Sequence, residues 1–180
     1  MIHHHTAHPL DYLGRSTYFF TVTCAHRLPH LADSIAAGDV LDSLLHSAVV
    51  KSFAIDPYCL MPDHVHILAE GLRSVSDALA FISHFKQHTS LPFKTKTLQI
   101  LWEFSYHNHI LRPQDSMVEV ARYIWWNPIR KNLCHYPAEY PFSGSQTINW
   151  LQAAATRPTW STPWSNQTQN QKQKHATASL

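Results

Sequence analysis

Two histidines in an alternating pattern are the first residues whose type and spacing could do chemistry. His64 and His66 flank Val65 in a run of apolar and β-branched residues. On a strand, both imidazoles would lie on one face and Val65 on the other. Two convergent histidines supply half of a site for Zn²⁺, Mn²⁺ or Fe²⁺, or for Mg²⁺ when oxygen ligands are added. The alternative is a hydrogen-bonded pair on a wet sheet face, which chance can produce in a chain with 15 histidines.

A second pair with the same spacing, His107 and His109, flanks Asn108. The central residue is polar, so a buried opposite face is less well supported here than for the first pair. Contact with phosphate and proton transfer are both open roles for these two side chains.

A tyrosine and an asparagine four residues apart form the next candidate pair. If one helix includes both, Tyr123 and Asn127 lie on the same face. A tyrosine hydroxyl can act as a nucleophile, and an amide oxygen can bind a divalent cation. Alternatively, Tyr123 is a half-buried aromatic residue and Asn127 caps a new helix that begins at Pro128. Because a following proline disfavours helical geometry, we expect Asn127 at a helix end.

Asp63 directly precedes the first histidine pair. It could orient one of these histidines as a carboxylate partner, or it could simply form the turn at residues 61–63.

The elements that must position these residues follow a regular order. Apolar periodicity predicts strands and helices in the order β-α-β-β-α-β, followed by a further helix. Gly38 should interrupt or delay the first helix, and Pro57 should place a bulge or an edge in the second strand. Ser116 and Glu119 predict a capping box at the start of the last helix. The strands are expected at 18–24, 53–60, 64–70 and 101–111, the last of them interrupted by polar groups. The helices are expected at 31–50, 74–90 and 116–126.

This order is typical of an α+β, ferredoxin-like fold, in which two helices cover one face of an antiparallel sheet. We expect a polar leader over 1–15, one domain over 16–145 and a polar tail over 146–180 that is at least partly disordered. Three tryptophans in that tail indicate that part of it docks on something: Trp150, Trp160 and Trp164.

Composition excludes several classes of protein. No apolar run approaches the roughly 18 residues of a membrane helix, and the N-terminus lacks the apolar core of a secretory signal. Three widely spaced cysteines form neither a disulfide framework nor a CxxC zinc motif, so we expect a reducing, cytoplasmic setting. The chain also lacks the HExxH motif of a zinc hydrolase.

Charge is unevenly distributed along the chain. Residues 1–71 contain three basic and seven acidic residues, whereas residues 72–180 contain eleven basic and five acidic residues. A basic C-terminal half suits a polyanion, because lysine and arginine neutralise phosphates and release counterions. A solvated face followed by a basic tail would give the same count.

Three motifs in this order carry a family resemblance: MPDHVHI at 61–67, WEFSYHNHILR at 102–112 and YIWWNPIR at 123–130. Together they resemble the IS200-like single-tyrosine (Y1) HUH transposases, and most closely the REP-associated tyrosine transposases. The resemblance spans about residues 18–145 and implies the ferredoxin-like fold that the element order also predicts.

The resemblance implies a role for each matching residue. His64 and His66 would bind Mg²⁺ or Mn²⁺, Asn127 would be the third ligand, and Tyr123 would be the nucleophile. The implied enzyme cuts and rejoins single-stranded DNA through a 5′-phosphotyrosine, acting on hairpins of short palindromic REP elements. It would work in the bacterial cytoplasm at the nucleoid, as a monomer with its site completed in cis or as a homodimer.

Single strands are bound by basic grooves with aromatic side chains on which bases stack. The alternative function is a catalytically silent, domesticated nucleic-acid-binding module of the same fold. The candidate DNA-binding residues are Lys86, Arg112, Arg122, Arg130, Lys131 and Trp102.

Overall fold

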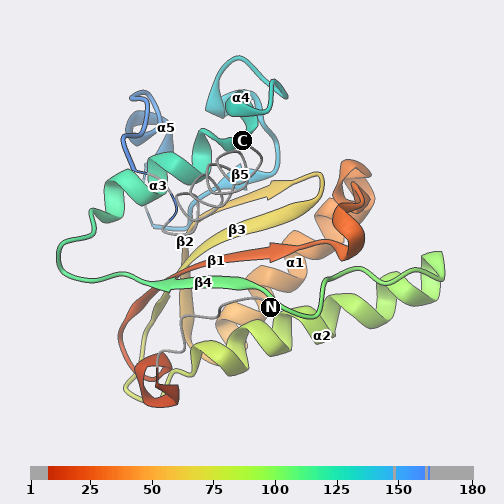
Figure 1. Ribbon diagram of the computed structural model, residues 1–180, viewed down its shortest axis with the longest axis horizontal. Coiled ribbons are helices and arrows are strands. Elements are labelled where there is room, and N and C mark those ends of the chain that lie inside the picture. Colours follow the sequence, from red (N-terminus) through yellow and green to blue (C-terminus); the bar gives the residue numbers. More distant parts are fainter. Residues whose placement is uncertain (1–7, 148, 161, 163–180) are drawn as a thin grey trace, which may run out of the picture.

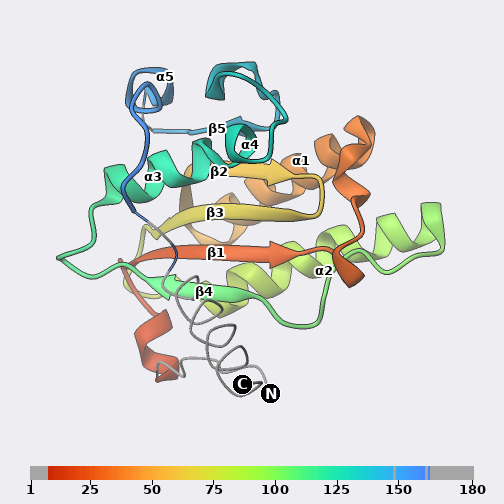
Figure 2. The same cartoon turned by 45° about the horizontal axis from the view of Figure 1, so that its top comes forward.

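The computed structural model describes residues 8–147, 149–160 and 162. They form a five-stranded antiparallel sheet with the strand order β4-β1-β3-β2-β5 and with helices on both faces (Figures 1 and 2). The strands are β1 (Thr17–Thr23), β2 (Phe53–Met61), β3 (His64–Gly71), β4 (His107–Ile110) and β5 (Ser143–Gly144). The α-helices are α1 (Ser34–Lys51), α2 (Ala78–Thr97), α3 (Met117–Trp125), α4 (Asn127–Arg130) and α5 (Trp150–Ala153). Short 3₁₀ turns occur at Pro9–Tyr12, Ala25–Arg27, His30–Ala32 and Pro137–Glu139.

The first four strands and the first two long helices confirm the ferredoxin-like arrangement. Alternate residues of β1 and β3 point to opposite faces of the sheet, because side chains on a strand have a period of two. On one face Phe20, Val65 and Ile67 are fully buried against α1 and α2, and they form the main core. On the other face Phe19 and Leu68 pack with Tyr123 from α3.

Several element boundaries differ from those expected from the sequence. Helix α1 begins at Ser34, capped by the Asp33 carboxylate, and continues through Gly38 without a break. A Cβ at Gly38 would meet no atom within 4 Å, so this glycine is not required by a close contact. Helix α2 begins after Asp77 and includes Pro92 before it ends at Thr97.

The strand expected at 101–111 is interrupted, as its polar residues indicated, and its regularly paired part is shorter than expected. The four residues His107–Ile110 form β4 and pair with β1. Trp102 forms an isolated bridge with Cys24, and the Glu103 backbone N–H donates to the Thr23 carbonyl oxygen at 2.9 Å. The residues between Trp102 and His107 are not in a strand, and the side chain of Phe104 among them is fully exposed. The register of β2 shifts between Ile55 and Tyr58, so the bulge expected at Pro57 is confirmed.

The capping box at α3 is only half formed. The Ser116 hydroxyl accepts a hydrogen bond from the Glu119 backbone N–H at 3.4 Å. The Glu119 carboxylate instead binds Arg122 and the backbone and side chain of Thr159. Glu119 therefore ties the C-terminal segment to α3 rather than closing the cap.

Both ends of the described chain pack on the sheet. Tyr12 is buried in the main core, and its hydroxyl donates to the Asn108 side chain at 2.8 Å. Trp150 packs on Trp125, and Trp160 packs on Tyr123, as the tryptophans of the tail led us to expect. Trp164 and the low-complexity residues 166–180 lie outside the described residues.

Within the described ranges, none of the helices has both the length and the hydropathy needed to cross a bilayer.

Candidate active site

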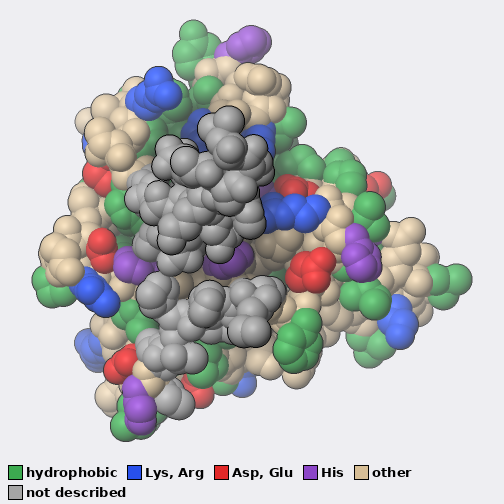
Figure 3. Space-filling model, viewed as in Figure 1, with side chains coloured by type: hydrophobic (Ala, Val, Ile, Leu, Met, Phe, Trp, Pro, Cys, Tyr) green, Lys and Arg blue, Asp and Glu red, His purple; other side chains and the backbone are tan. Residues whose placement is uncertain are grey.

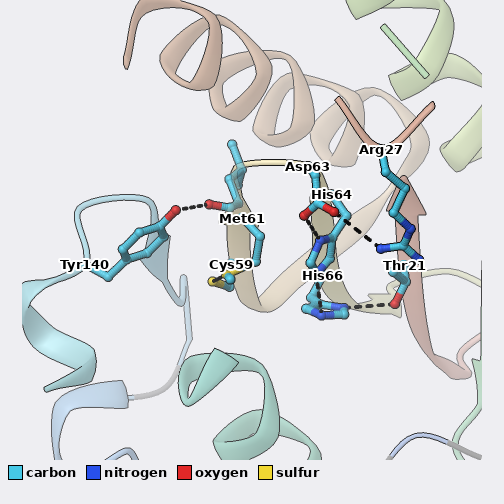
Figure 4. Close-up of polar contacts among 9 residues, drawn as sticks. Thr21, Arg27, Cys59, Met61, Asp63, His64, His66 and Tyr140 are labelled. Atoms are coloured by element: carbon cyan, nitrogen blue, oxygen red, sulfur yellow. Dashed lines mark hydrogen bonds and ion pairs between the residues drawn. The ribbon is translucent and has the colours of Figure 1, made fainter. Parts of the chain in front are cut away.

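The first histidine pair lies on β3, on the sheet face that α3 covers. Because β1 and β3 pair in register, Thr21 lies opposite His66 and Thr23 lies opposite His64. Both imidazoles are buried, with 7% and 4% of His64 and His66 exposed. Their Nε2 atoms face each other at 3.1 Å (Figure 4). The alternation read from the sequence is therefore confirmed.

The other ring nitrogen of each histidine has its own partner (Figure 4). His64 Nδ1 lies 2.6 Å from Asp63 Oδ1, and His66 Nδ1 lies 2.9 Å from Thr21 Oγ1. A hydrogen bond from His64 lowers the pKa of Asp63 to about 2, aided by Arg27 at 3.4 Å from its other oxygen. Asp63 therefore orients His64 as an ionised carboxylate.

Burial lowers the pKa of His66 well below its usual value, and the neighbouring His64 and Arg130 lower it further. His66 is thus held neutral, which keeps a ring lone pair available near neutral pH.

Tyr123 reaches this face from the last turn of α3. Its ring centroid lies 5.8 Å from that of His66 and 6.1 Å from that of Phe19. The guanidinium of Arg130 lies 4.6 Å from the centre of the tyrosine ring. Trp160 packs edge-on at 5.0 Å and helps to leave Tyr123 only 6% exposed.

Asn127 begins the short helix α4 directly after α3, as expected for an asparagine before proline. Its Nδ2 donates to the carbonyl oxygens of Tyr123 at 2.8 Å and Ile124 at 3.4 Å. With Nδ2 engaged in this way, the amide oxygen is the free acceptor of the side chain. Asn127 lies close enough to His66 to raise the pKa of that histidine, against the larger lowering by burial. The structure thus brings together the four residues that the sequence motifs singled out.

These residues fit a divalent cation in donor type and spacing. Two ligand atoms about 2.1 Å from a cation and at a right angle to each other lie about 3 Å apart, which matches the Nε2 separation of 3.1 Å. Two neutral imidazoles and one amide oxygen form a mixed nitrogen and oxygen set, which suits Mn²⁺ and, with added waters, Mg²⁺. Among the described histidine, cysteine, aspartate and glutamate residues, no group of three is assembled as a metal site. The candidate site therefore depends on Asn127.

The second histidine pair lies on the same sheet face, because His107 pairs with Thr21 and His109 with Phe19. His109 Nε2 lies 2.9 Å from Asp115 Oδ2, which also accepts from the Arg112 backbone N–H. His109 therefore fixes the loop that leads into α3.

The candidate DNA-binding residues are dispersed. Arg130 and Lys131 are exposed on and just after α4, and Arg112 is exposed before α3. Arg122 is held within the protein by Glu119 Oε1 at 2.6 Å and by the Ala153 carbonyl at 3.0 Å. Figure 3 shows lysine and arginine side chains scattered among acidic and histidine side chains over the visible side of the molecule.

Lys86, a residue of α2, and Trp102 lie on the opposite side of the sheet. The Lys86 ammonium donates to the carbonyl oxygens of Glu103 and Phe104, both at 2.8 Å. Trp102 is 5% exposed in the main core, and its indole donates to Thr89 Oγ1 at 2.7 Å. Their roles in DNA binding stay predictions, but the structure gives both side chains partners inside the protein.

Sequence reasoning missed Thr21 and the role of Trp160. Alternation placed Thr21 on one face of its strand, but the register that sets it opposite His66 cannot be read from spacing alone. Tryptophans in a polar tail indicated docking without saying where.

Known proteins resemble this chain in fold and in sequence. No protein-family model matches the chain. A Haemophilus influenzae protein with the provisional name REP-associated tyrosine transposase is 19% identical over 145 residues, covering 74% of this chain and 81% of that protein.

Among solved structures, a REP-associated tyrosine transposase bound to a REP hairpin superposes with a TM-score of 0.65 at 19% identity, covering 79% of this chain and 82% of the other. A provisional transposase of Deinococcus radiodurans gives a TM-score of 0.48 at 21% identity, over 57% of this chain and 83% of the other. The chain therefore has the fold of a REP-associated tyrosine transposase and resembles that family in sequence.

Proposed function

We propose, from this resemblance in fold and sequence, that the chain is a metal-dependent tyrosine transposase acting on single-stranded, REP-type hairpin DNA. One observation carries the proposal: a tyrosine, two histidines and an asparagine from β3, α3 and α4 meet in one buried cluster. A structural role alone gives no reason for two imidazoles to face each other with their partners fixed by Asp63 and Thr21.

The chemistry follows from the residue types. The Tyr123 hydroxyl attacks a DNA phosphorus, the bond from phosphorus to the 3′ oxygen breaks, and a 5′-phosphotyrosine forms. The phenol loses its proton and the leaving 3′ oxygen gains one. Attack by another 3′-OH reverses the step and rejoins DNA without ATP.

The metal ligands, Arg130 and Asp63 each have a different task in this chemistry. His64, His66 and Asn127 would hold Mg²⁺ or Mn²⁺, which supplies charge stabilisation at a non-bridging phosphate oxygen. Arg130 beside the tyrosine ring favours the negative charge of a phenolate and of an incoming phosphate. Asp63 holds His64 in orientation.

The complete set of residues comes from one chain, which favours a monomer with its site completed in cis. We also infer that the protein works in the bacterial cytoplasm, where its DNA is.

A cleavage assay tests the proposal. Labelled hairpin DNA from the palindromic repeats beside the gene is incubated with Mg²⁺ or Mn²⁺ and with wild type or Tyr123→Phe. We expect a covalent adduct between protein and DNA that requires the cation and is absent in Tyr123→Phe.

Tyr106→Phe is the matched control. The Tyr106 ring packs on Phe20 and near Lys86, on the face opposite the histidine pair, so adduct formation should continue. DNA binding without an adduct under either cation would instead support the catalytically silent module.

A further inference from the structure

Three histidines gather on the outer side of the helical layer, away from the candidate active site. His46 belongs to α1, and His84 and His88 belong to α2. These two helices pack side by side on the sheet face opposite α3 (Figures 1 and 2). We propose that the three imidazoles form a second metal site, which binds Zn²⁺ and joins α1 to α2. The proposal is independent of the DNA chemistry.

The packing of the two helices brings the three rings together. His84 and His88 are four residues apart on α2, so they lie on one face of that helix. His46 lies beside both of them across the contact between the helices. Its neighbour Ser47 is fully buried in that contact, and the Ser47 hydroxyl lies 2.9 Å from His84 Nδ1.

The spacing of the rings suits a shared cation. An imidazole that binds Zn²⁺ at about 2.0–2.1 Å has its ring centre about 3.2 Å from the ion, so two such rings at a tetrahedral angle have centres about 5.2 Å apart. The ring centres of His46 and His88 are 5.3 Å apart, and those of His84 and His88 are 5.5 Å apart.

The third side of the triangle is wider, at 6.2 Å between His46 and His84. Among the described residues the three rings are therefore not assembled around one point. His46 and His88 are exposed, so their side chains can rotate toward a cation without disturbing the core.

Ser47 is a partner of the kind that metal-binding histidines use. In a histidine ligand, the ring nitrogen that does not bind the metal usually donates a hydrogen bond that fixes the ring. With His84 Nδ1 against the Ser47 hydroxyl, Nε2 is the nitrogen that would bind the cation, and Nδ1–H would donate to the hydroxyl oxygen. The buried serine thus orients one ligand of the site.

The type of ligand selects the cation. Three imidazoles suit Zn²⁺ with a water in the fourth position. Mg²⁺ prefers oxygen ligands and should not bind here. The candidate active site differs, because it also offers the amide oxygen of Asn127.

Thermal unfolding of the full chain tests the site. A cation that joins two helices binds the folded protein, so Zn²⁺ at about a hundred times its Kd should raise the Tm by roughly 5–10 °C. A chelator should reverse this rise. Consecutive histidines such as those at 3–5 can bind Zn²⁺ without a fold, so they should add little to it.

His46→Ala and His88→Ala each remove an exposed ligand, so both proteins should fold and should lose most of the rise. Ser47→Ala should weaken Zn²⁺ binding about tenfold. His135→Ala is the matched control, because it removes an exposed histidine outside α1 and α2 and should keep the wild-type rise. Any shift that Mg²⁺ produces should be the same in wild type and in His88→Ala.

Nitrogen NMR of ¹⁵N-histidine-labelled protein identifies the rings that bind. We expect Zn²⁺ to shift the ring signals of His46, His84 and His88 together. A rise in Tm that persists in both His46→Ala and His88→Ala would assign Zn²⁺ to other histidines and overturn the proposal. No rise in the wild type would overturn it as well. Neither result bears on the DNA adduct, which depends on Tyr123 and the opposite face of the sheet.

Discussion

Arg130 is the charged residue whose position next to Tyr123 was not evident from sequence. Its guanidinium lies over the tyrosine ring, 4.6 Å from the ring centre, so a fixed positive charge lies beside the proposed nucleophile. A cation over an aromatic face contributes about 0.5–2 kcal/mol, depending on how far it is desolvated.

Arg130→Met should therefore slow adduct formation about tenfold or more, while Lys94→Met should leave the rate near that of wild type. Lys94 is an exposed residue on α2, which packs on the opposite face of the sheet. Single-turnover rates at saturating DNA separate this effect from weaker binding. Equal losses in the two variants would mean that Arg130 acts only through general charge.

The affinity of the site for a cation should depend on the Asp63 carboxylate, which orients His64. Asp63→Asn keeps the size of the side chain but removes the acceptor charge that orients His64. Mn²⁺ affinity measured by calorimetry should fall about tenfold to a hundredfold. Asp39→Asn, which removes an exposed ion pair with Lys96, is the control and should change nothing. Unaltered affinity in Asp63→Asn would limit Asp63 to the turn before β3.

Helix α3 is the element that carries both the nucleophile and the attachment of the C-terminal segment. Trp125 is fully buried on it and donates from its indole to the Gly144 carbonyl at 3.1 Å, so it links α3 to β5. Trp125→Ala should lower the free energy of unfolding by about 3–5 kcal/mol. Trp126→Ala, at a half-buried position one residue on, should cost less in the same denaturant titration.

Glu119 makes the attachment sensitive to acid. Hydrogen bonds from Thr159 and Arg122 lower its pKa from an ordinary value of 4.5 to about 2. Because the folded-state pKa is lowered, the stability it contributes is present above pH 4.5 and is lost as the pH falls toward about 2. Glu119→Gln should flatten this part of an acid unfolding profile followed by circular dichroism. If the profile of Glu119→Gln keeps the wild-type slope, Glu119 does not hold the C-terminal segment on α3 through its charge.

Elements with strong periodicity could be predicted from the sequence, and connections could not. The alternation at His64 and His66 and the start of α3 at Ser116 are local patterns, and both are confirmed. The length of β4 depends on which residues find partners on β1, which is not a local property. Helix α2 continues through the exposed Pro92 to Thr97, and Phe93 packs against the core there.

At the scale of the whole molecule, the sheet brings into one place residues about 60 positions apart. The sequence named the four residues of the candidate site but gave no distances among them, because these depend on α3 packing on the face of β2 and β3. That packing joins the histidine pair and the tyrosine within one chain.

A mixing experiment tests this arrangement. Tyr123→Phe and His66→Ala proteins should both lack adduct formation, and a mixture of the two should lack it as well. Each protein mixed with wild type serves as the control for inhibition. Recovered activity in the mixture of variants would show that two chains exchange their tyrosines.

One close contact in the fold has a consequence for natural sequence variation. A Cβ on Gly71, at the end of β3, would come within 2.0 Å of the Gly14 carbonyl oxygen. A side chain at position 71 is therefore excluded unless the backbone at position 14 moves. Among homologous sequences, a larger residue at position 71 should therefore occur together with a change at position 14. A glycine at 71 should be found in chains whose N-terminal segment passes as close to β3 as it does here.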